Sequence, residues 1–298
     1  MKKLNTLAAL TALSLLAGCG SAASEPVTPD TPDVSEPATE TTTETVVYRT
    51  LDEIKDSGTI RIGVFSDKAP FGYVNENGEY DGYDVYFAER IGQDLGVDIE
   101  YVSLDPANRV EFAETGKVDI VLANFTVTAE RAEKVDFALP YMKVQLGIVS
   151  SEADPINDVS DLEGTGKELI IAKGTTAETY FENNHPDVVL QKYDAYADAY
   201  NALLDGRGAG LSTDNTEVLA WAAVNPGFVV NVAALGDVDT IAPAVSKGNT
   251  TLLEWINDEI VSLADEEFFL NDYEATLREV YGEESNAYDL IVEGGVID

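Results

Sequence analysis

Apolar and polar residues follow one another along this chain with two alternating periods. The stretch "TIRIGVF" (59–65) is a short β-branched run of the kind found in strands. From Val85 to Leu95, apolar residues recur at helical spacing, and a glycine follows. The run "VDIVLANFT" (118–126) is almost entirely apolar, which is typical of a strand covered on both faces. Strands that alternate with helices predict an α/β fold with mostly parallel sheets.

The same alternation begins again after Ser150. The stretch "ELIIAKGTTAETYF" (168–181) reads as a strand, a turn and a helix, and "AGLSTDNTEVLAWAA" (209–223) repeats that order. Two α/β units in series predict two lobes. No sequence repeat is strong enough to make them duplicates of each other.

The chain begins with features of a secretory signal. Lys2 and Lys3 precede an apolar run from Leu4 to Leu16, which is shorter than the ~20 residues that span a bilayer. The motif "LAGC" resembles the lipobox of bacterial lipoproteins, which implies cleavage after residue 18 and a lipid on Cys19. The alternative is an ordinary signal peptide with a chance cysteine.

Residues 19–45 differ in composition from the rest of the chain. They are rich in Thr, Pro, Glu, Ser and Asp and have almost no apolar surface to bury, which predicts a disordered acidic tether behind the lipidated Cys19. Globular patterning begins near Val46. About 250 residues remain after it, enough for two domains.

Charge and composition exclude several classes of function. The chain has 18 Lys and Arg residues against 55 Asp and Glu residues, a formal charge of −37, which argues against binding to nucleic acid or anionic lipid surfaces. His185 is the only histidine and Cys19 the only cysteine, so nucleophilic triads are disfavoured, while catalysis by carboxylates stays open. No cysteine-rich zinc motif or calcium-binding loop is present, and we expect no metal and no cofactor.

Polar residues gather where three predicted strands pass into helices. In open α/β sheets, ligands bind beyond the carboxyl ends of the strands. The three junctions are Ala123–Thr128 followed by Arg131, Lys173–Thr176, and Ser212–Thr216.

Arg131 stands at an unfavourable position in the first junction. Thr128 reads as a helix N-cap, and Arg131 takes the place where a capping box has Glu or Gln, next to the positive end of the helix dipole. A ligand carboxylate would neutralise it there. The alternative is an exposed arginine that pairs with Glu133 or Asp136.

The other two junctions supply complementary groups. Gly174, Thr175 and Thr176 offer free amides and hydroxyls for an anion, or else Thr175 or Thr176 is a plain N-cap. Asp214 is a candidate partner for an ammonium group, or else it forms a capping box with Glu217. One cation, one anion and several neutral donors are the complement of a zwitterion, and a free α-amino acid fits them.

At these residues the chain resembles the family 3 solute-binding proteins, the polar amino-acid receptors of ABC importers. The stretches that carry the resemblance are "IRIGVFSDKAPFGY", "GYDVYFAERIG", "NFTVTAERAEKVDF", "KGTTAETYF" and "GRGAGLSTDNTEVLAW". It implies two α/β lobes joined by crossing strands near 141–150 and 238–243, which close on the ligand. We expect lobe 1 to comprise residues 46–144 and 239–298, and lobe 2 to comprise residues 145–238.

The resemblance also implies roles for site residues. Arg131 would bind the ligand α-carboxylate, helped by Asn124 and Thr126 from lobe 1 and by Gly174, Thr175 and Thr176 from lobe 2. Asp214 would take the α-ammonium group.

The chain departs from the family pattern in three stretches. Tyr86 stands where an acid is usual. Residues Gly208–Gly210 replace the usual "VDA" before the third junction. The residues before "APF" are Phe65–Lys68, where an aromatic residue or Asp is common. The ring that covers the ligand is therefore left open among Phe65, Phe71 and Phe125, and each of these is equally a candidate for core packing.

The ligand side chain is predicted only by analogy. The stretches "ANRVEF", "DTIAPAV" and "IVEGG" look most like the branch that includes cysteine-binding members. Arg109, if it faces the cleft, would favour glutamate or aspartate. Glutamine is a further alternative ligand. The alternative to a role in binding is an ion pair of Arg109 with Glu111 or with another residue of its own lobe. A rival of another class is a cyclohexadienyl-dehydratase-like enzyme on the same scaffold.

The expected setting follows from the signal and the family. We expect a monomer that is not an enzyme, anchored through Cys19 to the outer face of the cell membrane, of Gram-positive type. Its partner would be the membrane-embedded permease of an ABC importer.

Overall fold

The computed structural model describes residues 48–297, which belong to one compact unit. The predicted signal peptide, the lipidated Cys19 and the acidic tether lie outside the described residues. Within 48–297, no helix is long and apolar enough to cross a membrane.

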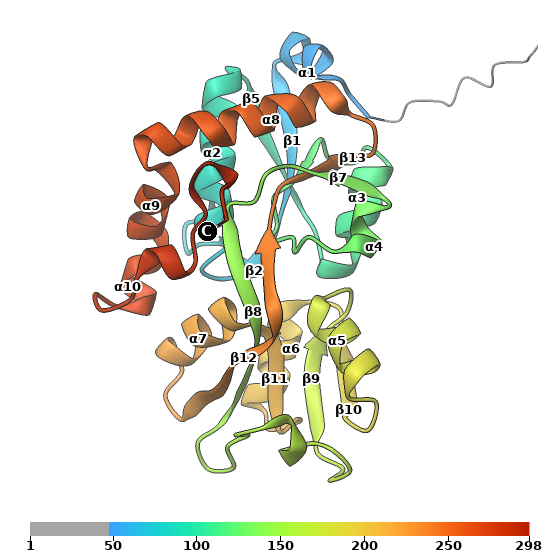
Figure 1. Ribbon diagram of the computed structural model, residues 1–298, viewed down its shortest axis with the longest axis vertical. Helices are drawn as coiled ribbons and strands as arrows, with labels where there is room; N and C mark the ends of the chain where they lie inside the picture. The colour runs from blue at the N-terminus through green and yellow to red at the C-terminus, as the bar shows by residue number, and fades with distance from the viewer. Residues whose placement is uncertain (1–47, 298) are drawn as a thin grey trace, which may run out of the picture. The chain divides into compact units, whose positions relative to one another are not determined.

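Two five-stranded sheets organise the chain (Figure 1). We call the part built on the first sheet lobe 1 and the part built on the second lobe 2. The first sheet has the order β5-β1-β6-β13-β7, and its strands are β1 (Thr59–Val64), β5 (Asp98–Ser103), β6 (Ile120–Val121), β7 (Val135–Phe137) and β13 (Ala244–Ser246). The second sheet has the order β10-β9-β11-β8-β12, and its strands are β8 (Met142–Ser151), β9 (Glu168–Ala172), β10 (Val189–Tyr193), β11 (Gly210–Asp214) and β12 (Phe228–Ile241).

Helices cover both sheets, which confirms the α/β prediction. Those beside the first sheet are α1 (Leu51–Ser57), α2 (Tyr83–Leu95), α3 (Arg109–Glu114), α4 (Ala129–Ala132), α8 (Thr250–Leu263) and α9 (Phe268–Asp272). Those beside the second sheet are α5 (Thr176–Asn184), α6 (Tyr196–Leu204) and α7 (Asn215–Val224). Helix α10 (Arg278–Tyr281) follows α9 and packs against α7. A small three-stranded sheet of β2 (Asp67–Lys68), β3 (Gly72–Val74) and β4 (Tyr80–Asp81) belongs to lobe 1.

Each large sheet has one strand that runs against the other four. In the first sheet β13 pairs antiparallel with both β6 and β7, and in the second β8 pairs antiparallel with both β11 and β12. The remaining pairings, β1 with β5 and β6, and β9 with β10 and β11, are parallel. The sheets are therefore mostly parallel, and the reversed strands belong to the connections between lobes.

The long pair β8 and β12 joins the two lobes (Figure 1). It runs from the Phe228–Ser151 pairing in the second sheet to the Ile241–Met142 pairing beside lobe 1, with three register shifts on the way. The ends of the pair are fixed to lobe 1 by single bridges, Thr126 to Ile241 and Met142 to Ile291. Antiparallel pairing gives the connection a continuous backbone ladder, while its irregular register reduces its stiffness.

An aromatic cluster fills part of the core of lobe 1. Phe87 of α2 packs with Tyr141, Phe268 and Phe269, at ring-centre distances of 5.0–5.8 Å. Tyr86, which replaces the usual acid, lies 5.5 Å from Phe268. Tyr86 therefore extends the cluster at the edge of α2, which explains why an aromatic residue is tolerated there.

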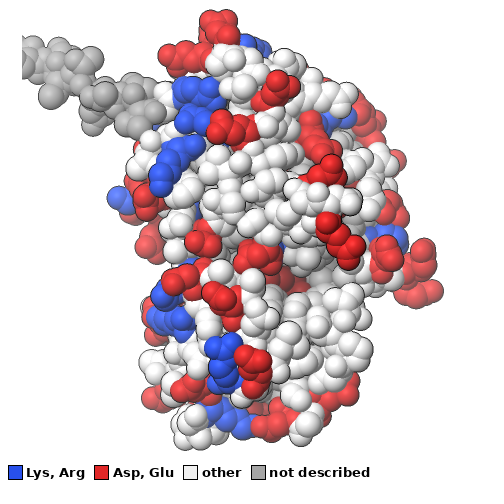
Figure 2. Space-filling view, turned by 180° about the vertical axis from the view of Figure 1, so that it is seen from behind, with Lys and Arg blue, Asp and Glu red and all other residues white. Residues whose placement is uncertain are grey.

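Acidic side chains spread over both lobes, with Lys and Arg scattered among them (Figure 2). Some acids are nevertheless buried. Burial raises the pKa of Asp84, of Glu217 and of Glu259 to about 7 in each case. It also raises the pKa of Asp272 well above its usual range, and the Oδ2 of Asp272 has no hydrogen-bond partner in the described chain.

These buried acids predict that stability rises as the solution becomes more acidic. In the unfolded chain the same groups titrate near pH 4, so between about pH 4 and pH 7 the folded state binds more protons than the unfolded state. The free energy of unfolding should therefore increase as the pH falls from 8 to 5. A gain of ~1 kcal/mol in the free energy of unfolding raises the melting temperature of a protein of this size by ~2–4 °C. We therefore expect the melting temperature to rise by about 2 °C or more.

Two variants separate the buried acids from the overall charge. Asp272→Asn should flatten the dependence of melting temperature on pH, since it removes one of the groups that takes up a proton on folding. Glu76→Gln changes the charge equally at an exposed position and should leave the slope as in the wild type. A melting temperature that falls between pH 8 and pH 5 would contradict the prediction.

Candidate functional site

Arg131 occupies the helix start that the sequence predicts, and its side chain points toward lobe 2. Thr128 is the N-cap of α4 and accepts a hydrogen bond from the Arg131 backbone N–H at 3.2 Å. The guanidinium donates to the carbonyl oxygens of Thr126 (2.7 Å) and Gly174 (2.9 Å). Neither Glu133 nor Asp136 pairs with it, so the alternative of a surface ion pair is wrong.

Arg109 reaches the same place from α3. It is almost fully buried, and it donates to the carbonyl oxygens of Pro106 (3.0 Å), Ala123 (3.2 Å), Asn124 (3.0 Å) and Gly174 (3.2 Å). The alternative pairing with Glu111 is not formed. Arg109 therefore faces the space between the lobes but is held by backbone carbonyls.

The two guanidinium groups converge on one carbonyl oxygen, that of Gly174. Burial, followed by repulsion from Arg109, lowers the pKa of Arg131 to about 9. Burial also lowers the pKa of Arg109. No carboxylate lies within ion-pair distance of either guanidinium in the described part of the chain. Two partly desolvated cations without an anion form a place where a carboxylate would be strongly bound.

Aromatic rings surround these cations. Phe125 lies close to both guanidinium groups, with its ring centre 4.7 Å from that of Arg109 and 4.9 Å from that of Arg131. Phe65 lies 5.5 Å from Arg109. Phe71 is fully buried, like the other two rings. All three candidate rings thus lie in the core, and two of them also contact the guanidinium group of Arg109 or Arg131. Packing in the core and lining the site are therefore compatible roles for these rings.

Asn124 links the site to the core of lobe 1. Its backbone is in the left-handed region, with φ of 43°. Its N–H donates to the Oδ2 of Asp84 at 2.7 Å, and the Oδ1 of Asp84 accepts from the hydroxyl of Tyr141 at 2.6 Å. Because Asp84 holds the peptide, the carbonyl of Asn124 is presented to Arg109 and its side chain points to Lys68.

In the Gly174 turn of lobe 2, the alternative of a plain N-cap is confirmed. Thr175 is the N-cap of α5, and its hydroxyl accepts from the N–H of Glu178 at 3.3 Å. The N–H of Gly174 is not free, because it donates to the Glu178 carboxylate at 2.7 Å. Lobe 2 therefore presents the Gly174 carbonyl to the arginines. Thr176 is the first residue of α5, and it forms none of the hydrogen bonds that join the other site residues.

Asp214 is buried at the end of β11, and the predicted capping box is wrong. Asp214 makes no side-chain bond to the start of α7. Glu217 turns inward instead, where it accepts from Thr213 at 2.9 Å and pairs with the ammonium group of Lys68 at 3.1 Å. Pairing with a buried cation leaves Glu217 unable to return to the backbone of Asp214.

Lys68 is the site residue that the sequence analysis missed. Its side chain is 1% exposed, and its Nζ lies 2.7 Å from the Oδ1 of Asn124, 3.3 Å from the hydroxyl of Tyr196 and 3.4 Å from Asp214. Burial alone would lower the pKa of Lys68, but Glu217, Tyr196 and Asp214 outweigh it and the pKa is raised. The sequence signal that could have identified Lys68 is its position directly before "APF", where an aromatic residue or Asp is common in the family.

The structure thus brings most of the predicted residues together between the lobes. Arg131, Arg109, Phe125, Asn124 and Gly174 form one contact network, and Lys68 connects it to Asp214. A hollow of about 440 Å³ opens where Phe125, Arg131 and Gly174 meet. Among residues 48–297, no cluster of His, Cys, Asp and Glu is arranged to hold a metal ion.

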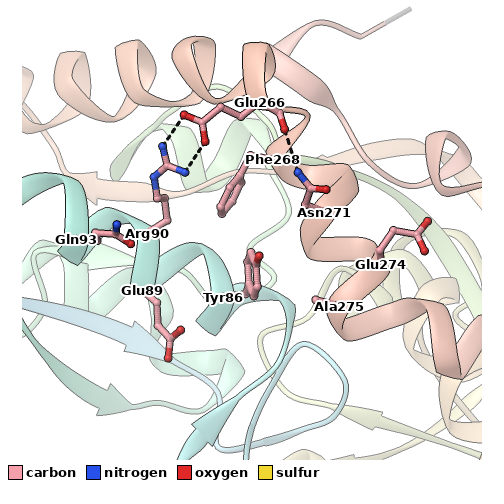
Figure 3. A pocket seen from close by; sticks show the side chains of 9 residues that line it. All are labelled: Tyr86, Glu89, Arg90, Gln93, Glu266, Phe268, Asn271, Glu274 and Ala275. Carbon is pink, nitrogen blue, oxygen red and sulfur yellow. Dashed lines mark hydrogen bonds and ion pairs between the residues drawn. The ribbon is translucent and has the colours of Figure 1, made fainter.

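A second hollow, of about 700 Å³, lies in lobe 1 away from these residues (Figure 3). It lies between α2 and the α9 region and is lined by Tyr86, Phe268 and several acids. Its arginine, Arg90, is already paired with both carboxylate oxygens of Glu266. None of the predicted site residues lines it.

Two solved structures that resemble this chain are of proteins described as binding cysteine. The solute receptor for L-cysteine of Neisseria gonorrhoeae is 48% identical, with a TM-score of 0.80, over 82% of this chain and 100% of that one. The cysteine-binding protein from Campylobacter jejuni is 46% identical, with a TM-score of 0.80, over 82% of this chain and 98% of that one.

More distant relatives share the same region. The ABC transporter glutamine-binding protein GlnH of Bacillus subtilis is 28% identical over 77% of this chain and 85% of its own length. Cyclohexadienyl dehydratase of Pseudomonas aeruginosa is 25% identical over 59% of this chain and 66% of its own. The family model described as bacterial extracellular solute-binding proteins, family 3, matches residues 60–269. The chain therefore belongs to the bacterial extracellular solute-binding proteins, family 3.

Proposed function

We propose that this solute-binding protein is the amino-acid receptor of an ABC importer and that its ligand is free L-cysteine. The observation that carries the proposal is the convergence of Arg131 and Arg109 on Gly174, with Asp214 buried nearby. Positive groups without an anion, close to a buried carboxylate, suit the two charges of an α-amino acid. The two cysteine-binding structures, at 48% and 46% identity, support the choice of ligand.

In this proposal the ligand α-carboxylate binds Arg131 at the position that faces the Gly174 turn. Asn124 and Thr126 contribute from lobe 1, and Thr175 and Thr176 contribute from lobe 2. Asp214 accepts from the α-ammonium group, and the rings of Phe65, Phe71 and Phe125 form the apolar wall.

The hydrogen bonds of Arg109 favour a neutral side chain. Its Nε, Nη1 and Nη2 donors all go to backbone carbonyls. A guanidinium that is already engaged in this way has little capacity left for a second ligand carboxylate. We therefore place glutamate and aspartate behind cysteine as ligands, and we place the neutral glutamine behind it on the similarity to the two cysteine-binding structures.

Binding would be coupled to closure of the two lobes. A ligand held by Arg131 on one side and by Asp214 on the other contacts both lobes at once, so it stabilises the closed state selectively. We propose lobe boundaries at residues 46–144 with 239–298, and 145–238, with β8 and β12 as the connection that bends.

The setting of the receptor is proposed from the sequence. Residues 1–18 act as a lipoprotein signal, Cys19 carries the lipid, and residues 20–45 extend the folded part away from the membrane. The receptor acts as a monomer on the outer face of the cell membrane, of Gram-positive type, and delivers its ligand to the importer permease without chemical change.

A ligand screen tests the proposal. Protein from Val46 onward is melted in the presence of each of the twenty amino acids and of cystine. Ligand at ~100–1,000 times its dissociation constant should add ~3–4 kcal/mol to the free energy of unfolding, and we expect this for cysteine. Stabilisation by glutamate alone would move the assignment to an acidic ligand. If no amino acid stabilises the protein and it converts prephenate or arogenate, the receptor function is wrong and the dehydratase-like enzyme is the better assignment.

Arg131→Ala should abolish most of the affinity. Loss of a buried charge partner costs ~3–5 kcal/mol, so the dissociation constant for cysteine, measured by calorimetry, should rise about 100-fold or more. Arg207→Ala removes an exposed arginine of lobe 2 and is the matched control, with unchanged affinity expected. Equal affinities of Arg131→Ala and wild type would exclude this guanidinium from the site.

Gly174→Ala should block closure. A Cβ on Gly174 would lie 2.5 Å from the Cα of Ala107 in lobe 1, which forces the lobes apart. Gly206→Ala is the control, because Gly206 has a similar positive φ of 68° but open space around it. We expect both variants to melt at similar temperatures without ligand, and only Gly174→Ala to lose affinity, by about tenfold or more. Equal affinities of the two variants would argue against closure at this contact.

A further inference from the structure

Lys68 crosses from lobe 1 into the acidic part of lobe 2. It lies on β2, and the neighbouring Asp67 accepts a hydrogen bond at 2.9 Å from the backbone N–H of Ala197, near the start of α6. This bond fixes β2 against lobe 2. The Lys68 ammonium group is thereby placed 3.1 Å from Glu217 and 3.4 Å from Asp214.

The charges at this point do not balance. One ammonium group faces two carboxylates, all of them at least nine-tenths buried. Glu217 is the nearer acid and is 1% exposed, and its Oε1 has no hydrogen-bond partner among the described residues. When Glu217 is ionised, above its pKa of about 7, Lys68 neutralises one of the two carboxylates and leaves one negative charge. A ligand with a single ammonium group supplies the balancing charge.

The surroundings of Lys68 form a cage suited to an ammonium group. Its Nζ lies 4.5 Å from the ring centre of Tyr196, 5.4 Å from that of Phe65 and 5.9 Å from that of Phe71. Aromatic faces and carboxylates together are the groups that recognise organic cations. The protein fills this cage with a side chain of its own.

We propose that Lys68 is a specificity-determining residue: as a built-in ammonium group in the Asp214–Glu217 cage, it restricts the cleft to amino acids with one ammonium group and excludes basic ones. The inference rests on the proposed function, namely that the cleft binds a free amino acid. A second ligand ammonium would find the cage occupied and would meet Lys68, Arg109 and Arg131 in a poorly hydrated space. Like charges there repel far more strongly than in water.

The test is a comparison of neutral and basic ligands in charge-altered variants. Dissociation constants for L-cysteine, L-ornithine and L-arginine are measured by calorimetry in wild type, in Lys68→Met and in Lys68→Met with Glu217→Gln. Lys68→Met keeps the volume of the chain but vacates the cage. We expect the affinity ratio of ornithine to cysteine to rise at least tenfold in Lys68→Met. It should return toward the wild-type ratio in the double variant, where one acid remains.

Glu217→Gln alone gives an independent readout. Lys68 is then left to pair with Asp214, which withdraws the partner of the ligand ammonium, so cysteine affinity should fall at least tenfold. The double variant should restore it. This arm stays informative if Lys68→Met does not fold, because Glu217→Gln keeps the buried lysine and its hydrogen bond to Asn124.

The outcomes separate the two proposals. If wild type binds cysteine but the ratio is unchanged in folded Lys68→Met, or cysteine affinity is unchanged in Glu217→Gln, the role of Lys68 is wrong and the receptor function stands. If wild type binds none of the twenty amino acids, the proposed function fails and the inference fails with it.

Discussion

The structure depends on holding three cations between two lobes, where Arg109 and Lys68 are buried and Arg131 is partly buried. Arg131, Arg109 and Lys68 are held there by hydrogen bonds to carbonyl and amide oxygens, and only Lys68 has carboxylates within reach. Such groups lose hydration energy on burial, and neutral acceptors repay only part of it. In the proposed function, a ligand carboxylate bound at Arg131 would supply an anion that the described chain does not place beside this guanidinium, and this pairing would be a source of affinity.

Hydrogen bonds in the core of lobe 1 hold the polar groups of the candidate site in fixed positions. Asp84 binds the Asn124 peptide and the Tyr141 hydroxyl, and both bonds lie in the core. Asn124 is thereby held in a left-handed conformation that few residues adopt without support. A preorganised carbonyl and side chain at this turn spare the ligand the cost of ordering them. In the proposed closure, lobe 2 would approach this fixed surface as a unit on the β8–β12 pair.

The features of the fold and the candidate site that depend on neighbouring residues could be predicted from the sequence. Arg131, Gly174 and Asp214 were identified because each stands where an apolar strand passes into a helix, and both elements leave a local pattern. The alternation of strands and helices gave the α/β class, and family-like stretches gave the two-lobe arrangement. Thr128 as an N-cap was also predictable, since the bond spans three residues.

Contacts between distant segments could not be predicted in this way. Lys68 is buried by Tyr196 and Asp214, which lie 128 and 146 positions further along the chain. The capping box of Asp214 and Glu217 failed for the same reason, because a lysine from the other lobe is a stronger partner than a local N–H. The occupied N–H of Gly174 reflects Glu178, which stands in a T-x-x-E capping pattern with Thr175 but reaches the residue before the N-cap.

The contact of Gly174 with Ala107 sets a limit of another kind. The two backbones come so close that not even a methyl group fits between them. Main chain, unlike side chains, cannot move aside by changing rotamer, so in the proposed closure this point would act as a mechanical stop for the hinge. The smallest volume the cleft can enclose would then be fixed by the scaffold. A change of ligand size during evolution would have to begin at this stop or in the hinge strands, rather than in the residues that touch the ligand.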